Sequence, residues 1–145
     1  MKNKKVSIGD VFRFEISATC VFLQYLGLHS LMGECLLCQN SRCDQIPAFI
    51  PDKSKIIFYP IRLNVKQENV SYVASLEAAR EVPTSIRRPF IQNKKVAYWF
   101  LDEPCGTRKV ESLTEGEARY PLGVGISHEV LIDVQEGRKW FLFND

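Results

Sequence analysis

The chain has 145 residues and a mass of 16.6 kDa, a length typical of one domain. Hydrophobic residues make up 46% of it and charged residues 25%, which excludes a wholly disordered chain. Nucleic-acid-binding proteins usually carry a patch or stripe of basic residues. The formal net charge of this chain is only +2, which argues against such a surface. We therefore expect one globular domain, spanning residues 1–145, with no nucleic-acid partner.

The sequence predicts a cytoplasmic protein without a membrane partner. No apolar run approaches the ~20 residues that a membrane-spanning helix needs. The basic first residues resemble the start of a secretion signal, but Ser7 and Gly9-Asp10 interrupt the apolar core that must follow. Five cysteines cannot form a closed set of internal disulfides, and a reducing cytosol predicts free thiols. Cys20, in an apolar run, is interpreted as a small buried hydrophobe.

Alternating apolar residues predict strands through the first half of the chain. In the first strand, Phe12, Phe14 and Ile16 share one side while Arg13 and Glu15 occupy the other, which is typical of a half-buried strand. Strand patterns cover residues 11–16, 19–28, 33–39, 56–65 and 70–75. Residues 40–55 are rich in turn formers and predict a loop, and a proline within 56–65 indicates an edge or a bulge.

Strand patterns also predominate in the second half of the chain. Residues 76–81 have the best helix propensity, but Pro83 leaves room for a short helix or none. The segment 84–90, between Pro83 and Pro89, predicts irregular structure. Further strand patterns cover residues 95–101, 110–114, 124–126, 129–134 and 139–143. About eight or nine short strands predict a mainly β fold, a small single-domain bent sheet or SH3-like barrel with one short helix.

One group of residues has the composition of a metal site. Cys35, Cys38 and Cys43, with His29 upstream, could supply the four ligands of a structural zinc ion. The spacer Leu36-Leu37 favours an extended strand instead, on which Cys35 and Cys38 point to opposite faces. We therefore expect no metal and no cofactor.

Catalytic motifs are weak. His128-Glu129 begins like a zinc-protease helix, but Ile132 stands where the second histidine is required. Gly123-Val124-Gly125 lacks the third glycine and the helix of a dinucleotide-binding loop. The chain is expected not to be an enzyme, although a deep pocket joining His29 or His128 to a thiol would indicate one.

Two stretches resemble a known family. Residues 6–14, Val-Ser-Ile-Gly-Asp-Val-Phe-Arg-Phe, and residues 21–27, Val-Phe-Leu-Gln-Tyr-Leu-Gly, are similar to the first two strands of the immunity protein 26 family of bacterial polymorphic-toxin systems. Residues 73–90 are compatible with a family segment, and the order of strands fits over most of the chain. The chain departs from the family in Thr19-Cys20 and in its cysteine-rich third strand, where a glycine-rich aromatic hairpin is expected.

The resemblance implies a small barrel-like fold that binds and neutralises a cognate toxin protein by occlusion, without catalytic residues. A β-barrel that binds a small ligand or nucleic acid is the alternative. For the partner-binding residues the sequence predicts Arg87, Arg88, Tyr98 and Trp99. The two arginines lie in a proline-stiffened segment with no obvious strand partner, and aromatic and guanidinium groups often dominate protein interfaces.

Overall fold

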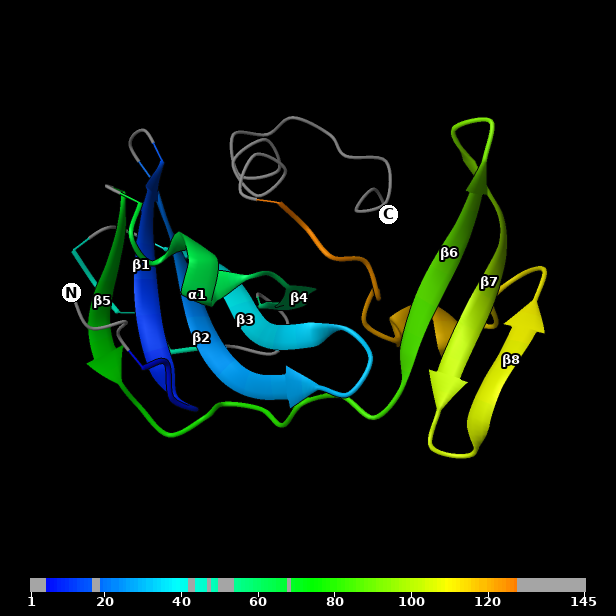
Figure 1. Ribbon diagram of the computed structural model, residues 1–145, viewed down its shortest axis with the longest axis horizontal. Helices are drawn as coiled ribbons and strands as arrows, with labels where there is room; N and C mark the ends of the chain where they lie inside the picture. The colour runs from blue at the N-terminus through cyan, green and yellow to red at the C-terminus, as the bar shows by residue number, and fades with distance from the viewer. Residues whose placement is uncertain are drawn as a thin grey trace.

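The computed structural model describes residues 5–16, 19–41, 44–46, 48–49, 54–67 and 69–127. In these residues eight strands form two antiparallel sheets, connected by short helical turns and extended segments (Figure 1). The mainly β fold predicted from the alternation is confirmed. The strands predicted at 129–134 and 139–143 lie outside the described residues.

The first sheet contains five strands in the order β4-β3-β2-β1-β5. Their bounds are Asp10–Ile16 for β1, Thr19–His29 for β2, Gly33–Ser41 for β3, Lys55–Phe58 for β4 and Val70–Ser75 for β5. The hairpins β1–β2 and β2–β3 follow the ranges expected from the sequence. A short helix, α1 (Ile61–Asn64), connects β4 to β5.

Both faces of the first sheet carry buried apolar clusters in its central strands, while Arg13 and Glu15 of β1 remain partly exposed. One face contributes Phe12, Phe14, Leu23, Leu36 and Ile57 to a large cluster, and alternate residues of the same strands form smaller clusters on the other face. Phe12 and Phe14 therefore share a face, as their spacing predicts. Because neighbouring residues of a strand point to opposite sides, near-continuous apolar runs such as that of β2 are needed to fill both clusters.

The stretch predicted as one strand at residues 56–65 is divided in two. Strand β4 ends at Phe58, and α1 begins at Ile61, whose side chain is fully buried in the main cluster. Pro60 lies at the boundary and has no N–H to continue a strand ladder. The single-strand prediction was wrong because the proline ends the strand here, where we had expected an edge or a bulge.

The second sheet has three strands in the order β6-β7-β8, with bounds Ile86–Gln92, Lys95–Glu103 and Gly106–Val110. Asn93 and Lys94 both have positive φ, as a tight two-residue hairpin turn requires. The prediction of irregular structure at 84–90 was wrong from Ile86 onward, where β6 begins. Pro89 is tolerated because β6 lies at an edge of the sheet. The strand predicted at 110–114 was misplaced, since β8 ends at Val110.

The connection from β5 to β6 is extended, and no helix forms at residues 76–81. The buried side chain of Gln24 explains this conformation. Its amide nitrogen donates to the carbonyl oxygen of Glu77 over 3.0 Å, and its oxygen accepts from the N–H of Ala79 over 2.9 Å. These backbone groups are the ones a helix would use for its own bonds, so the tertiary contact replaces the local preference.

Two further contacts hold the second sheet against the first. Ile86, the first residue of β6, is fully buried in a cluster with Leu26, Cys35 and Phe58 of the first sheet. A strap at residues 121–126 then crosses from one sheet to the other. Within this strap the N–H of Gly123 donates to the carbonyl oxygen of Arg87, and the N–H of Ile126 donates to that of Phe58. The short strand predicted at 124–126 is reduced to a single bridge between Gly125 and Phe58.

Candidate functional site

One face of the second sheet gathers aromatic and cationic side chains, and we call it the aromatic face. Paired residues of neighbouring strands share a face, so the register defines it. Its members are Ile86, Arg88, Phe90 and Gln92 of β6, Lys95, Tyr98, Phe100 and Asp102 of β7, and Thr107 and Lys109 of β8. Ile86 at its base packs on the first sheet, so this face is turned toward the first sheet there.

Three aromatic rings form a ladder across the aromatic face. Phe90 and Tyr98 are stacked, with ring centroids 4.6 Å apart and planes inclined by 5°. Tyr98 meets Phe100 edge-on at 5.4 Å. The side chain of Phe90 is exposed, and those of Tyr98 and Phe100 are half-buried. Large apolar rings that remain partly exposed on a sheet are a common feature of protein interfaces.

Arg88 is held on this face by an ion pair with Asp102. Its Nε donates to one carboxylate oxygen of Asp102, and its Nη2 donates to the other over 3.0 Å. The Thr107 hydroxyl donates to the same carboxylate over 2.6 Å. These hydrogen bonds, the one from Arg88 first, lower the pKa of Asp102. The expectation that Arg88 has no strand partner was wrong, because β6 pairs with β7 and places the two residues on one face.

Arg87 points to the opposite face of the sheet. Its Nε donates to the carbonyl oxygen of Tyr120 over 2.9 Å, and its guanidinium lies 4.9 Å from the ring centroid of Trp99. The four residues predicted to bind a partner are therefore divided between two faces. Arg88 and Tyr98 lie on the aromatic face, and Arg87 and Trp99 on the opposite face.

The segment 114–120 covers part of the opposite face, where it binds Arg87, Glu103 and Arg108. It contains a short 3₁₀ helix, η1 (Glu117–Arg119), and the turn before this helix is closed by a pair of hydrogen bonds like those of a capping box. Thr114 and Glu117 each accept a hydrogen bond from the other's backbone N–H. Glu117 also accepts from Arg108, and these bonds, the backbone bond first, lower its pKa. The guanidinium of Arg108 also binds Glu103, so charges are closely matched on this side.

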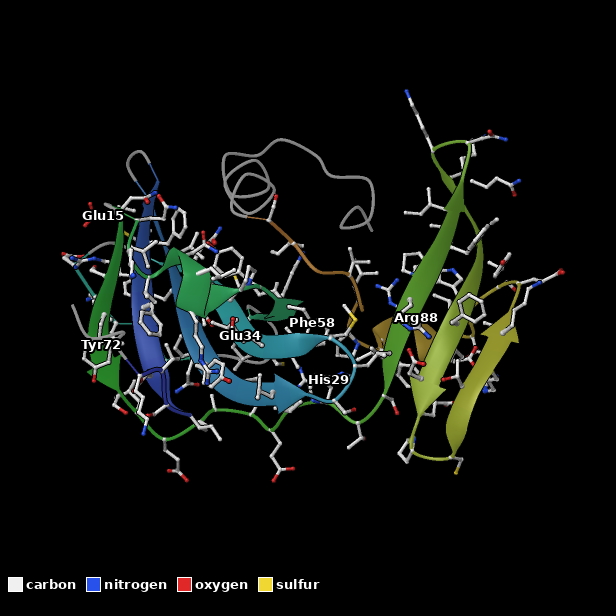
Figure 2. All side chains as sticks on the ribbon, in the orientation of Figure 1. Glu15, His29, Glu34, Phe58, Tyr72 and Arg88 are labelled. Carbon is white, nitrogen blue, oxygen red and sulfur yellow. The ribbon has the colours of Figure 1, made fainter. Side chains whose placement is uncertain are left out.

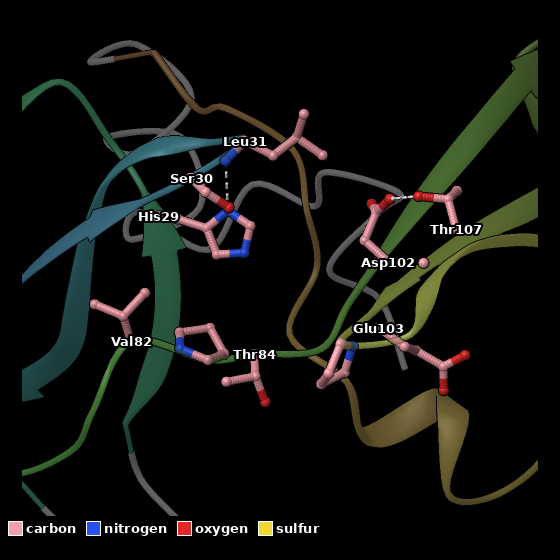
Figure 3. Close-up of a pocket in the computed structure, with 11 residues that line it drawn as sticks. His29, Ser30, Leu31, Val82, Thr84, Asp102, Glu103 and Thr107 are labelled. Carbon is pink, nitrogen blue, oxygen red and sulfur yellow. Dashed lines mark hydrogen bonds between the residues drawn. The ribbon is translucent and has the colours of Figure 1, made fainter.

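The base of the aromatic face opens into a crevice of about 560 Å³ between the sheets. Asp102 and Thr107 lie on one wall, and His29 at the end of β2 lies on the other (Figure 3). Figure 2 shows His29 beside Phe58, at the end of the first sheet nearest the second. The ring centroids of His29 and Phe58 are 5.4 Å apart.

The position of His29 is determined by the turn that follows β2. Its Nδ1 accepts hydrogen bonds from the N–H groups of Leu31 and Met32, each over 3.1 Å. The proton of the neutral ring is therefore on Nε2. Burial lowers the pKa of His29, and the nearby Asp102 offsets this in part.

Acidification is expected to weaken the fold through His29. The pKa of His29 is lower in the folded protein than its usual 6.5, so the unfolded chain binds the proton more tightly. Neutral His29 therefore contributes to the free energy of unfolding. This contribution is fully present above pH 6.5 and is lost as the pH falls through the lower pKa of His29 in the folded protein. Urea unfolding between about pH 7.5 and about pH 5 should show stability falling less in His29→Gln than in the wild type. Equal slopes for the two proteins would show that protonation of His29 does not destabilise the turn.

The described cysteines differ in environment. Cys35, Cys38 and Cys105 are free thiols, while Cys20 is disulfide-bonded, so the expectation of a free thiol at Cys20 was wrong. Cys43 lies outside the described residues. Cys35 and Cys38 belong to clusters on opposite faces of β3, as the Leu36-Leu37 spacer predicts. Within the described residues, no group of histidine, cysteine and acidic side chains is placed to hold a metal ion.

The residues that carry the family resemblance have structural roles in the first sheet. The Asp10 carboxylate accepts from the N–H of Ser7 over 2.9 Å, and the N–H of Gly9 donates to the carbonyl oxygen of Tyr25. Gln24 binds the connection between the sheets. These contacts stabilise the strand entry and are remote from the aromatic ladder.

Comparison of the chain with known proteins finds no matching family model, no matching curated protein and no matching solved structure. The resemblance to immunity protein 26 therefore stays a prediction. Among the described residues, no helix has the length and apolar character needed to cross a membrane.

Sequence reasoning missed Phe90, Asp102 and Lys109 as members of the site. The sequence did not indicate Phe90 as a site residue, because the nearby prolines predicted irregular structure at 84–90. Alternation of Ile86, Arg88 and Phe90 was the available signal, and reading it as a strand would have placed these side chains on one face.

Proposed function

We propose that this protein is an immunity protein, which binds a cognate bacterial toxin and neutralises it by occlusion. The observation that carries the proposal is the ladder of Phe90, Tyr98 and Phe100, partly exposed on the aromatic face. Burying these rings against a partner would remove apolar surface from water, and aromatic side chains commonly anchor such contacts. The resemblance of residues 6–14 and 21–27 to the immunity family supports a toxin as the partner.

The ring contacts favour a protein over a single-stranded nucleic acid. Nucleic acids bind such surfaces by stacking bases on open ring faces. Phe90 from β6 stacks on Tyr98, and the amine of Lys109 from β8 lies 4.0 Å from the same ring centroid. The guanidinium of Arg88 lies 5.5 Å from the centroid of Phe100. Because neighbouring side chains already lie against the rings of Tyr98 and Phe100, a partner would contact the edges of these rings and the side chain of Phe90. Such a surface suits the packing of protein side chains better than the stacking of bases.

The chemistry of the two buried thiols and of His29 supports binding rather than catalysis. Burial raises the pKa of Cys35 and of Cys38 to about 12, so neither forms the nucleophilic thiolate at neutral pH. The Nδ1 atom of His29 accepts two backbone hydrogen bonds and does not serve as a base. His128 lies outside the described residues.

The proposed place of action is the cytoplasm. The disulfide at Cys20 argues in the opposite direction, because disulfides are rare in reducing compartments. Thiol titration of protein purified from the cytoplasm without reductant distinguishes the two.

The proposal is tested with the product of the open reading frame immediately upstream of this gene. The wild-type protein should bind that product and restore growth to cells that express it. Phe90→Ala should weaken binding by roughly tenfold, since Phe90 is 42% exposed and its loss leaves the core intact. Leu63→Ala is the matched control, because Leu63 is 78% exposed on α1, the helix that connects two strands of the other sheet.

Failure of the wild type to bind or protect would overturn the immunity function. If it binds and protects while Phe90→Ala behaves like Leu63→Ala, the partner binds another surface. Alanine substitution of both Arg87 and Arg88 is a poorer test of binding, because both side chains support the sheet itself.

A further inference from the structure

The charges of the aromatic face are not balanced. It carries three cationic side chains, Arg88, Lys95 and Lys109, and one carboxylate, Asp102. Asp102 is already bound to Arg88. Lys95 and Lys109 are exposed, and neither has an ion-pair partner among the described residues. Two cations are therefore left over on the face that also carries the aromatic ladder.

The opposite face of the same sheet differs. Arg108 binds the carboxylates of both Glu103 and Glu117, and Arg87 donates to a backbone carbonyl oxygen. Tyr120 donates its hydroxyl hydrogen to Glu103 over 2.7 Å. The arginines there are bonded within the chain, whereas the two strand lysines without an ion-pair partner both lie on the aromatic face.

Lys109 is placed at the ladder rather than at a distance from it. Its ammonium group lies 4.0 Å from the ring centroid of Tyr98, close enough for a cation–π contact. Lys95 starts β7 and lies opposite Gln92, in the second pair beyond the bulge that follows Phe90 and Tyr98. Lys109 thus lies beside the rings, and Lys95 lies on the same face nearer the tip of the sheet.

We infer that the partner of the aromatic face is a protein with an acidic contact surface, whose carboxylates meet Lys95 and Lys109 around an apolar centre that covers the rings. This rests on the proposed function and adds the chemistry of its partner. Unpaired charges at the rim of an interface act mainly on association, since they attract an oppositely charged partner before contact. The apolar ladder governs how long the complex lasts.

The experiment reverses the two charges in Lys95→Glu/Lys109→Glu. The matched control, Lys5→Glu/Lys66→Glu, makes the same change in net charge at two exposed lysines of the other half of the chain. Association and dissociation rates are measured against the upstream gene product, at low and at physiological ionic strength. Circular dichroism and thermal unfolding verify that both variants fold.

The charge-reversed variant should associate about tenfold more slowly than wild type at low ionic strength, and the difference should shrink as salt is added. The control variant should remain close to wild type. If both variants associate at equal rates while the wild type binds and protects normally, the inference of an acidic contact surface is wrong and the proposed immunity function still holds. Absence of wild-type binding would remove both. Displacement of the gene product by oligo(dT) would assign the face to nucleic acid and overturn the inference.

Discussion

Replacing Gly9 by alanine is expected to lower the free energy of unfolding by about 3 kcal/mol or more. Gly9 has a φ of +97°, a conformation that costs a non-glycine residue energy. A Cβ atom there would lie 2.1 Å from the carbonyl oxygen of Leu76, far inside contact distance. The substitution would push the chain off this site and break the bond from the N–H of Leu76 to the carbonyl of Gly9.

Gly33→Ala is a control that introduces the backbone strain expected in Gly9→Ala without the steric clash. Gly33 also has a positive φ, of +83°, but a Cβ atom at this position meets nothing within 4 Å. Its substitution should cost only about 1 kcal/mol, the usual penalty for that conformation. Urea unfolding followed by tryptophan fluorescence gives both values. Similar losses for the two variants would show that the close approach of Leu76 to Gly9 is not a significant constraint.

Truncating Ile86 to alanine is expected to cost about 3 kcal/mol, within the range for removing a large buried aliphatic side chain. Ile86 is fully buried, and it belongs to the second sheet while its neighbours in the cluster, including Leu26 and Phe58, belong to the first. The substitution leaves a cavity at the junction of the two sheets. If they form one cooperative unit, as a single domain over residues 1–145 predicts, unfolding should remain a single transition at lower urea concentration.

Ile91→Ala provides the comparison on the same strand. Ile91 is 42% exposed near the tip of β6, so its truncation should change stability by less than about 1 kcal/mol. Two separate transitions in Ile86→Ala, one for each sheet, would contradict the single unit. A loss no larger than that of Ile91→Ala would contradict the role of Ile86 in joining the sheets.

If both substitutions behave as expected, the aromatic face is carried on a rigid support. The second sheet would then meet a partner with its rings already in place, and little conformational entropy would be lost on binding. This would suit the proposed immunity function, because blocking a toxin requires a complex that dissociates slowly.

Local patterns in the sequence were enough to predict the fold class and many of the strands. Strands β1, β2, β3 and β7 begin and end close to the expected residues. Alternation of apolar residues with a period of two is set by the strand itself and needs no knowledge of distant contacts. The same rule placed Cys35 and Cys38 on opposite faces of β3.

Tertiary contacts decided the rest. Residues 76–81 prefer a helix locally, yet they are extended because Gln24, more than fifty positions earlier, binds their backbone. The segment around Pro89 is a strand because β7 pairs with it along one edge. Arg87 and Arg88 are adjacent in sequence, but pairing sends one to a carbonyl of Tyr120 and the other to Asp102. A binding surface on a sheet consists of residues that share a face. Which residues share a face depends on the register between strands, and the register is determined by strand pairing in the folded protein.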